Sequence, residues 1–380
     1  MTTVLSAKLM GFDTFVGNAQ AVQAVRGMLA GGRVPGALLF TGPDGVGKKT
    51  LALMLARAVN CERPLGGVDY CGNCARCRKA EEMLAATRED LDRRREIKDA
   101  QHRVEGLVYF DLQLIEPITR FILIEQIRQL RVVAYTRPFE LLRRVFVIDQ
   151  AQTIHWQAID LLLKVLEEPP ETTTLILVCS NAFELRPTIR SRCQRVPFRP
   201  VDEMVIRDLI KSDGRIPKAH RELAVRVARG SVATARSFDV REFELRRRPW
   251  IDFLESFARN RRAELLTPNW ERLFAASKAL TEQRDQFEDT LRMGYLLLQD
   301  LEHLVEEGNE SAVANIDLLP HLRAWAQHLG LRGVAGLKEG LDQASRLQVR
   351  NVNQRLGLET LAIDLLEQPG GPQSGPATPA

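Results

Sequence analysis

The chain has 380 residues, more than one compact domain usually holds, so two or three domains are expected. Hydrophobic residues make up 45% of it and charged residues 27%, and the net charge of +4 permits contact with nucleic acid without requiring it. No apolar run approaches the roughly 20 residues that cross a bilayer. Residues 1–17 lack a basic region followed by an apolar core. We therefore expect a cytoplasmic protein with no membrane partner.

Strand and helix patterns alternate from the first glycine-rich loop onward. Residues 36–41 are an apolar run that leads into this loop, and residues 48–60 then have a helical pattern. Charged residues crowd segment 81–106, which predicts a solvated helix or a partly disordered insertion of unknown role. Residues 121–134 indicate a strand end that runs into a helix.

Two further buried strands are predicted in the next part of the chain. They lie at 144–149 and 174–179, where β-branched and apolar residues run together. Between them, residues 159–168 predict a helix that stops at the prolines that follow. The alternation predicts a doubly wound α/β domain with a parallel sheet over residues 1–200.

The rest of the chain has helical patterns only. Residues 201–245 predict a small helical unit, and residues 246–368 a larger all-α region. Residues 369–380 are rich in Pro, Gly and Ser, which predicts a disordered tail.

The loop after the first strand has the spacing of a phosphate-binding loop. Residues 42–48 match the Walker A pattern G-x-x-x-x-G-K. Glycines let backbone N–H groups approach a phosphate, the following helix N-terminus favours its charge, and the lysine can reach the terminal phosphates. The candidate binding residues are Gly42, Gly45, Gly47 and Lys48.

Two positions that ATP hydrolysis requires carry the wrong residues. The Ser or Thr whose hydroxyl holds Mg²⁺ is replaced by Lys49, and Thr50 lies one residue late, about 100° around the helix. Asp149, at the end of the second buried strand, fits the metal-side carboxylate of a Walker B motif. The next position normally carries a Glu that activates water, but the amide of Gln150 accepts no proton at neutral pH. We expect no Mg²⁺-dependent hydrolysis, while ATP binding stays open.

Three segments resemble bacterial clamp-loader subunits of the AAA+ class. Residues 149–170 resemble their Walker B and LEEPP segment, residues 187–194 their Ser-Arg-Cys motif, and residues 124–130 the segment before Walker B. The resemblance spans about residues 12–240. It implies an AAA+ P-loop domain, a lid domain at 201–245 and a helical collar for oligomerisation at 246–368.

The family contains an ATPase subunit, gamma/tau, and a non-hydrolysing relative, delta-prime. Gamma/tau ends its loop in Gly-Lys-Thr/Ser, has Asp-Glu in Walker B and carries an arginine in a Gly-Ser-x-Arg segment. This chain has Lys49, Gln150 and Ala233 at those places, which favours the delta-prime type. The implied role is that of a stator in a five-membered ring with gamma/tau and delta subunits, which opens the sliding clamp and places it on primed DNA.

The alternatives to this role are an active ATPase and a DNA-binding module. The first is an active gamma/tau-like ATPase with a variant loop, against which the same three positions argue. The second is a sequence-specific DNA-binding module, for which the sequence has no recognition-helix signature.

The resemblance also gives a role to Arg192. In the family, the arginine of the Ser-Arg-Cys motif reaches across an interface to the γ-phosphate of ATP on a neighbour, so Arg192 is the expected arginine finger in trans. The alternative is an ordinary surface arginine in a basic stretch.

Four of the six cysteines lie within residues 61–77. Four thiolates at short spacings suit a tetrahedral zinc ion, and a site closed by four protein ligands is structural. The pattern also resembles the zinc module of clamp-loader ATPase domains; free thiols are the alternative. The predicted ligands are Cys61, Cys71, Cys74 and Cys77, whereas Cys179 and Cys193 are interpreted as buried side chains.

Overall fold

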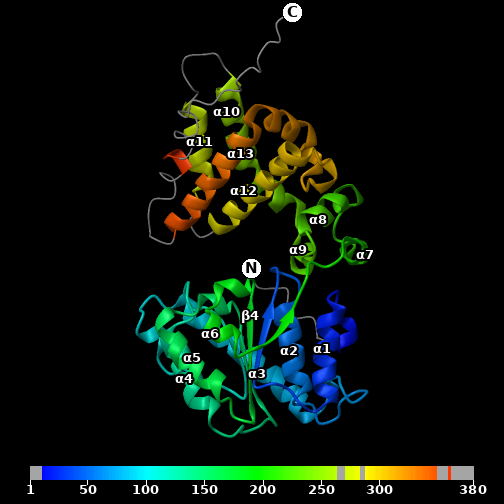
Figure 1. Ribbon diagram of the computed structural model, residues 1–380, viewed down its shortest axis with the longest axis vertical. Coiled ribbons are helices and arrows are strands. Elements are labelled where there is room, and N and C mark those ends of the chain that lie inside the picture. The colour runs from blue at the N-terminus through cyan, green and yellow to red at the C-terminus, as the bar shows by residue number, and fades with distance from the viewer. Residues whose placement is uncertain (1–10, 263–269, 283–286, 349–357, 361–380) are drawn as a thin grey trace, which may run out of the picture. The chain divides into compact units, whose positions relative to one another are not determined.

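The computed structural model describes residues 11–262, 270–282, 287–348 and 358–360, so the predicted tail at 369–380 lies outside the described residues. The described chain divides into two compact units (Figure 1). One holds residues 11–209 and 228–237, and the other holds residues 210–227 and those from 238 onward. The finer division at residues 200 and 245 stays a prediction.

The first unit is built on a five-stranded parallel sheet in the order β2-β3-β4-β1-β5. The strands are β1 (Ala37–Thr41), β2 (Leu112–Ile115), β3 (Arg144–Ile148), β4 (Thr173–Cys179) and β5 (Gln194–Pro197). The three predicted strands are confirmed as β1, β3 and β4. Near residue 121, the expected strand end is only an isolated bridge from Ile122 to Ile154. A parallel sheet gathers the carboxyl ends of its strands at one edge, where α/β proteins place their sites.

Helices cover both faces of this sheet. They are α1 (Ala19–Ala30), α2 (Lys48–Ala58), α3 (Ala75–Glu96), α4 (Ile124–Ala134), α5 (Ile159–Glu167) and α6 (Pro187–Arg190). The first unit also holds the short α9 (Val232–Ser237), later in the chain. Side chains alternate along β1: Leu38 and Phe40 pack with α1, α2 and α3, whereas Leu39 packs with α4 and α5. Figure 1 shows α4, α5 and α6 on one side of the sheet and α1 and α2 on the other.

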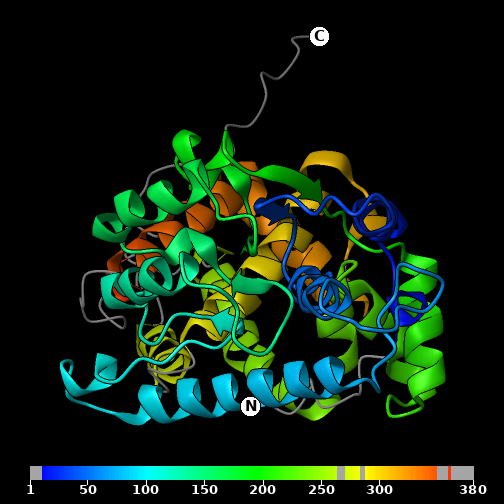
Figure 2. The ribbon, with the colours of Figure 1, turned by 90° about the horizontal axis from the view of Figure 1, so that it is seen from below.

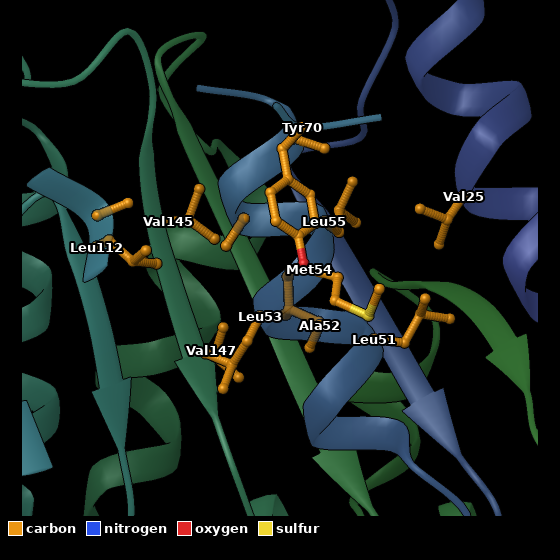
Figure 3. Packing of buried hydrophobic residues seen from close by; sticks show 14 of the residues in the cluster. Val25, Leu51, Ala52, Leu53, Met54, Leu55, Tyr70, Leu112, Val145 and Val147 are labelled. Atoms are coloured by element: carbon orange, nitrogen blue, oxygen red, sulfur yellow. The ribbon is translucent and has the colours of Figure 1, made fainter. Parts of the chain in front are cut away.

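Helix α2 is deeply buried against the sheet. Residues 51–56 of α2 are all 1% exposed or less. Figure 3 shows Leu51, Leu53 and Leu55 among side chains of the strands, including Val145 and Val147 of β3. Burying one such aliphatic side chain stabilises the fold by about 1.5–3 kcal/mol. The helix that begins at the glycine-rich loop is therefore firmly anchored.

Most of the charge-rich segment 81–106 belongs to α3, the long light-blue helix of Figure 2. It is not fully solvated, because Met83 and Leu84 are buried against the core. Arg94 is 4% exposed and its guanidinium donates to the carbonyls of Arg103 and Glu105 at 2.9 Å. The helix and the turn after it are therefore tied together.

The described part of the second unit is helical, as are residues 203–213, which lead into it. The remaining helices are α7 (Glu203–Asp213), α8 (Arg221–Ala228), α10 (Val240–Arg262), α11 (Trp270–Leu280), α12 (Phe287–Glu302) and α13 (Leu319–Gln348). Trp250, Phe253, Leu297 and Trp325 belong to one apolar core that α10 to α13 share. Across the described ranges, no helix combines the length and apolarity needed to cross a membrane.

Candidate functional site

The loop between β1 and α2 requires glycine at its predicted positions. Gly42, Gly45 and Gly47 have φ values of 145°, 76° and 97°. A Cβ on Gly42 would lie 2.3 Å from the carbonyl oxygen of Phe198, and one on Gly45 would lie 2.0 Å from Ser231 Oγ. The loop is therefore closely surrounded, and its backbone follows a path that other residues rarely adopt.

The first lysine of α2 turns back onto this loop. Lys48 Nζ donates to the carbonyl oxygens of Gly42 and Pro43, both at 2.6 Å, and lies 3.5 Å from Asp44. The side chain is 6% exposed. Burial lowers the pKa of Lys48, and Asp44 only partly counters this. A cation thus stands at the loop, as the motif predicts.

The second lysine points elsewhere, to the carboxyl ends of two neighbouring strands. Lys49 Nζ lies 2.7 Å from Glu116 Oε1 and 2.9 Å from Asp149 Oδ2. Glu116 directly follows β2, and Asp149 directly follows β3. Burial disfavours the ammonium form, but the charges of Asp149 and Glu116 outweigh it and raise the pKa of Lys49. Lys49 is therefore a fixed cation between the two carboxylates.

A second cation completes this cluster. Arg95, near the end of α3, donates to Glu116 Oε2 at 2.9 Å. Burial would raise the pKa of Glu116, but Lys49 and then Arg95 lower it. Two cations thus face two carboxylates, and the cluster is neutral as a whole. Sequence reasoning missed Glu116 because it missed β2; an acidic residue directly after a short apolar run is the signal that could have found it.

The position after Asp149 carries no general base. Gln150 is exposed, has a left-handed backbone (φ 52°), and its N–H donates to Asp149 Oδ1 at 3.0 Å. An amide oxygen is too weakly basic to take a proton from water.

The segment before α9 lies directly on the phosphate loop. The N–H of Ala233 donates to the carbonyl oxygen of Gly45 at 3.0 Å. The hydroxyl of Ser231 accepts from the N–H of Thr234 at 3.1 Å, next to the same glycine. The resemblance places the gamma/tau arginine at position 233. This position does contact the loop here, but the Ala233 side chain is only a methyl group.

Arg192 lies just after α6, near the surface. Its Nη2 is 2.6 Å from Glu167 Oε1, and its Nη1 donates to the carbonyl oxygen of Thr188 at 3.0 Å. The arginine side chain is 35% exposed and the glutamate side chain 48%. The guanidinium therefore lies outside the cluster around Lys49 and faces solvent.

The four clustered cysteines come together. Their sulfur atoms all lie within 4.8 Å of one another, and none forms a disulfide. The N–H groups of Cys71, Cys74 and Cys77 donate to the sulfurs of Cys61, Cys71 and Cys74 at 3.3, 3.3 and 3.4 Å. Burial would raise the pKa of Cys74, but backbone N–H groups of Glu62 and Cys77 lower it to about 6. This cluster could hold a metal ion.

Known proteins match the first unit in particular. The model of the family described as DNA polymerase III, delta subunit, matches residues 17–202. A gamma/tau subunit of DNA polymerase III from Mycobacterium bovis is 29% identical over 199 residues, 52% of this chain and 30% of that protein. The delta' subunit from Bacillus subtilis is 30% identical over 192 residues, 50% of each chain. The chain thus spans a third to a half of the length of these relatives.

Longer but weaker matches extend into the second unit. The tau subunit from Bacillus subtilis is 25% identical over 332 residues, 86% of this chain and 52% of that protein. A solved gamma-subunit-related protein from Thermotoga maritima is 18% identical and covers 92% of this chain and 99% of its own, with a TM-score of 0.42. On these sequence matches, residues 17–202 of this chain belong with the clamp-loader subunits of DNA polymerase III.

Proposed function

We propose that this chain is a non-hydrolysing, delta-prime-type subunit of a clamp loader, placed in a five-membered ring with gamma/tau and delta subunits. The ring would open the sliding clamp and place it on primed DNA. Three features support the non-hydrolysing role: Lys49 stands where the metal hydroxyl is needed, Gln150 where the base is needed, and Ala233 where an arginine would face the phosphates. An active ATPase would need different chemistry at all three places.

The observation that carries the proposed role is the setting of Arg192. The guanidinium is exposed and held by one exposed carboxylate, Glu167, whose ion pair contributes little stability at a surface. A phosphate on a neighbouring subunit carries more charge than Glu167 and can displace it. Arg192 would then neutralise the charge that develops on the neighbour's ATP during phosphoryl transfer.

We further propose that the four clustered cysteines hold a structural zinc ion. Tetrahedral coordination at about 2.3 Å places thiolates about 3.8 Å apart, which fits sulfurs that all lie within 4.8 Å of one another. With four protein ligands, Cys61, Cys71, Cys74 and Cys77 leave no open position for water, so zinc here would stabilise the 61–77 segment.

The P-loop can still take part by binding nucleotide. Gly42, Gly45, Gly47 and Lys48 keep the loop's shape and charge, and ATP bound there would stay intact. Segments 201–245 and 246–368, which the sequence predicts to be helical, would serve as lid and oligomerisation collar.

The role of Arg192 can be tested in a reconstituted complex with its ATPase and clamp-opening subunits. Arg192→Ala should fold and assemble normally, because it removes only an exposed side chain. An arginine finger contributes on the order of 10³–10⁵ in rate at its own site. The neighbouring ATPase site that Arg192 completes should therefore lose nearly all its activity. Total ATP hydrolysis by the complex should drop partially, and clamp loading should fall further.

Two control variants sharpen this experiment. Arg192→Lys should rescue little, because lysine lacks the planar fork that grips two phosphate oxygens. Arg195→Ala removes another exposed arginine, three residues along on β5, and should leave hydrolysis and loading unchanged. A complex with Arg192→Ala that hydrolyses and loads like the wild type would refute the proposed finger.

A further inference from the structure

The cluster around Lys49 bears on the metal that a P-loop site normally uses. Magnesium demands oxygen ligands at about 2.0–2.1 Å in a near-octahedral arrangement. Here Asp149 and Glu116 supply oxygens, but the Lys49 ammonium already stands between them at 2.9 and 2.7 Å. A divalent ion at the same place would meet a fixed positive charge at contact distance. The residues present do not fit Mg²⁺.

The ammonium, in contrast, fits this place well. The side chains of Glu116 and Asp149 are 14% and 12% exposed, so leaving two such carboxylates unpaired would be costly. Lysine carries three donors, and two of them reach one oxygen of each carboxylate. Arg95 satisfies the other oxygen of Glu116.

We propose that Lys49 is a built-in replacement for Mg²⁺: it excludes divalent cations from Asp149 and Glu116, so that any nucleoside polyphosphate held by this P-loop is bound without a metal ion. The inference deepens the proposed function, because a subunit that never holds Mg²⁺ cannot hydrolyse ATP. It rests on the Lys49 cluster and not on Arg192. The metal-replacement inference and the arginine-finger proposal can therefore fail separately.

Mn²⁺ serves as the probe, because it favours carboxylate oxygens as Mg²⁺ does and its binding is read directly by electron paramagnetic resonance. The full chain, with its cysteines loaded with zinc, should bind no Mn²⁺ at this cluster. Lys49→Met removes the charge and adds no ligand. The variant should bind one Mn²⁺ per chain, and Mn²⁺ should raise its melting temperature. Adding Asp149→Asn to Lys49→Met should abolish both effects.

Lys48→Met is the matched control. It removes a neighbouring cation that faces loop carbonyls and the single exposed carboxylate of Asp44, so Mn²⁺ should neither bind nor stabilise this variant. Should Lys49→Met fail to fold alone, refolding with and without Mn²⁺ makes the same test, and Mn²⁺ should restore folding.

Two results would overturn the inference. One is a wild-type chain that binds Mn²⁺ in a way that Asp149→Asn abolishes, because Lys49 would then not exclude the metal. The other is a Lys49→Met chain that gains no Mn²⁺ binding and no stabilisation or refolding. If either occurs while Arg192→Ala still silences one site of the complex, the proposed function stands and only the metal-replacement idea fails.

Discussion

A buried ion pair fastens the amino ends of β2 and β3. Arg144 Nη2 lies 2.7 Å from Asp111 Oδ1, with side chains 5% and 2% exposed. The second oxygen of Asp111 accepts the N–H groups of residues 139–141. Arg144 also donates to the carbonyl oxygens of Thr136 and Arg137. One carboxylate and one guanidinium thereby hold the loop before β3 against the sheet, at the end away from the P-loop.

Asp111→Ala should therefore be strongly destabilising. It leaves the Arg144 guanidinium buried without its partner, which costs roughly 3–5 kcal/mol of unfolding free energy. Asp13→Ala is the control: it breaks an ion pair with Arg26 in which Asp13 is 88% exposed, and should cost about 0–1 kcal/mol. Urea unfolding followed by circular dichroism measures both. Equal midpoints for the two variants would contradict this role for Asp111.

The same pair predicts a pH dependence. Burial would raise the pKa of Asp111, but the N–H groups of Glu140 and Leu141 and the Arg144 guanidinium lower it below its usual value. A depressed folded-state pKa gives stability that is present above the unfolded value of about 3.9 and is lost as pH falls through the folded value. As pH decreases, the urea concentration at the unfolding midpoint should thus fall more steeply for the wild type than for Asp111→Ala. Parallel pH profiles for the wild type and Asp111→Ala would contradict a depressed pKa for Asp111 in the folded protein.

At the scale of elements, the cysteine cluster joins the loop after α2 to the start of α3. Cys74 is the N-cap of α3, with its sulfur accepting from the N–H of Cys77. Cys61 and Cys77 are buried in the same core as α2. A metal ion at these sulfurs would therefore fix where α3 begins.

The purified chain should carry one zinc ion, and removing it should raise hydrogen exchange in residues 61–77 and the first turn of α3. Most of the sheet should stay protected, because its core does not depend on the sulfurs. Cys74→Ser should lower zinc content, whereas Cys193→Ser, at a buried position outside the cluster, should leave it unchanged. Zinc well below one per chain after purification without chelators would count against the site.

The sequence predicted three of the five strands of the sheet and missed two, for physical reasons. β1, β3 and β4 lie inside the sheet and are buried along their whole length, so they stand out as apolar runs. β2 has only four residues and includes Gln113, a polar residue that is nonetheless buried. β5 lies at the edge and buries only Val196. Short or edge strands carry weak apolar patterns, and both were missed.

The candidate site likewise was predicted only where its signals are local in the sequence. The spacing of glycines and lysine located the phosphate loop, and the end of a buried strand located Asp149, because both signals are local in sequence. The pairing of Lys49 with Glu116 depends on β2 lying beside β3, which no local pattern reveals.

At the scale of the whole molecule, a clamp-loader-like sequence over residues 17–202 is combined with a P-loop whose metal and base positions carry unusual residues. Lys49 and Gln150 occupy the positions where ATP hydrolysis needs a metal ligand and a base, and the Arg192 side chain is partly exposed at the surface. We infer a division of labour in which this subunit contributes structure and one arginine, and its neighbours contribute hydrolysis.

Single-turnover ATP hydrolysis by the isolated chain tests the non-hydrolysing role most directly. The chain, with Mg²⁺ and radiolabelled ATP, should release no phosphate above the background given by Lys48→Ala, because the metal hydroxyl and the base are both missing. Binding of ATP without release agrees with this prediction. Phosphate release at the rate of a motor subunit, abolished by Lys48→Ala, would mean that the chain is an ATPase and would contradict it.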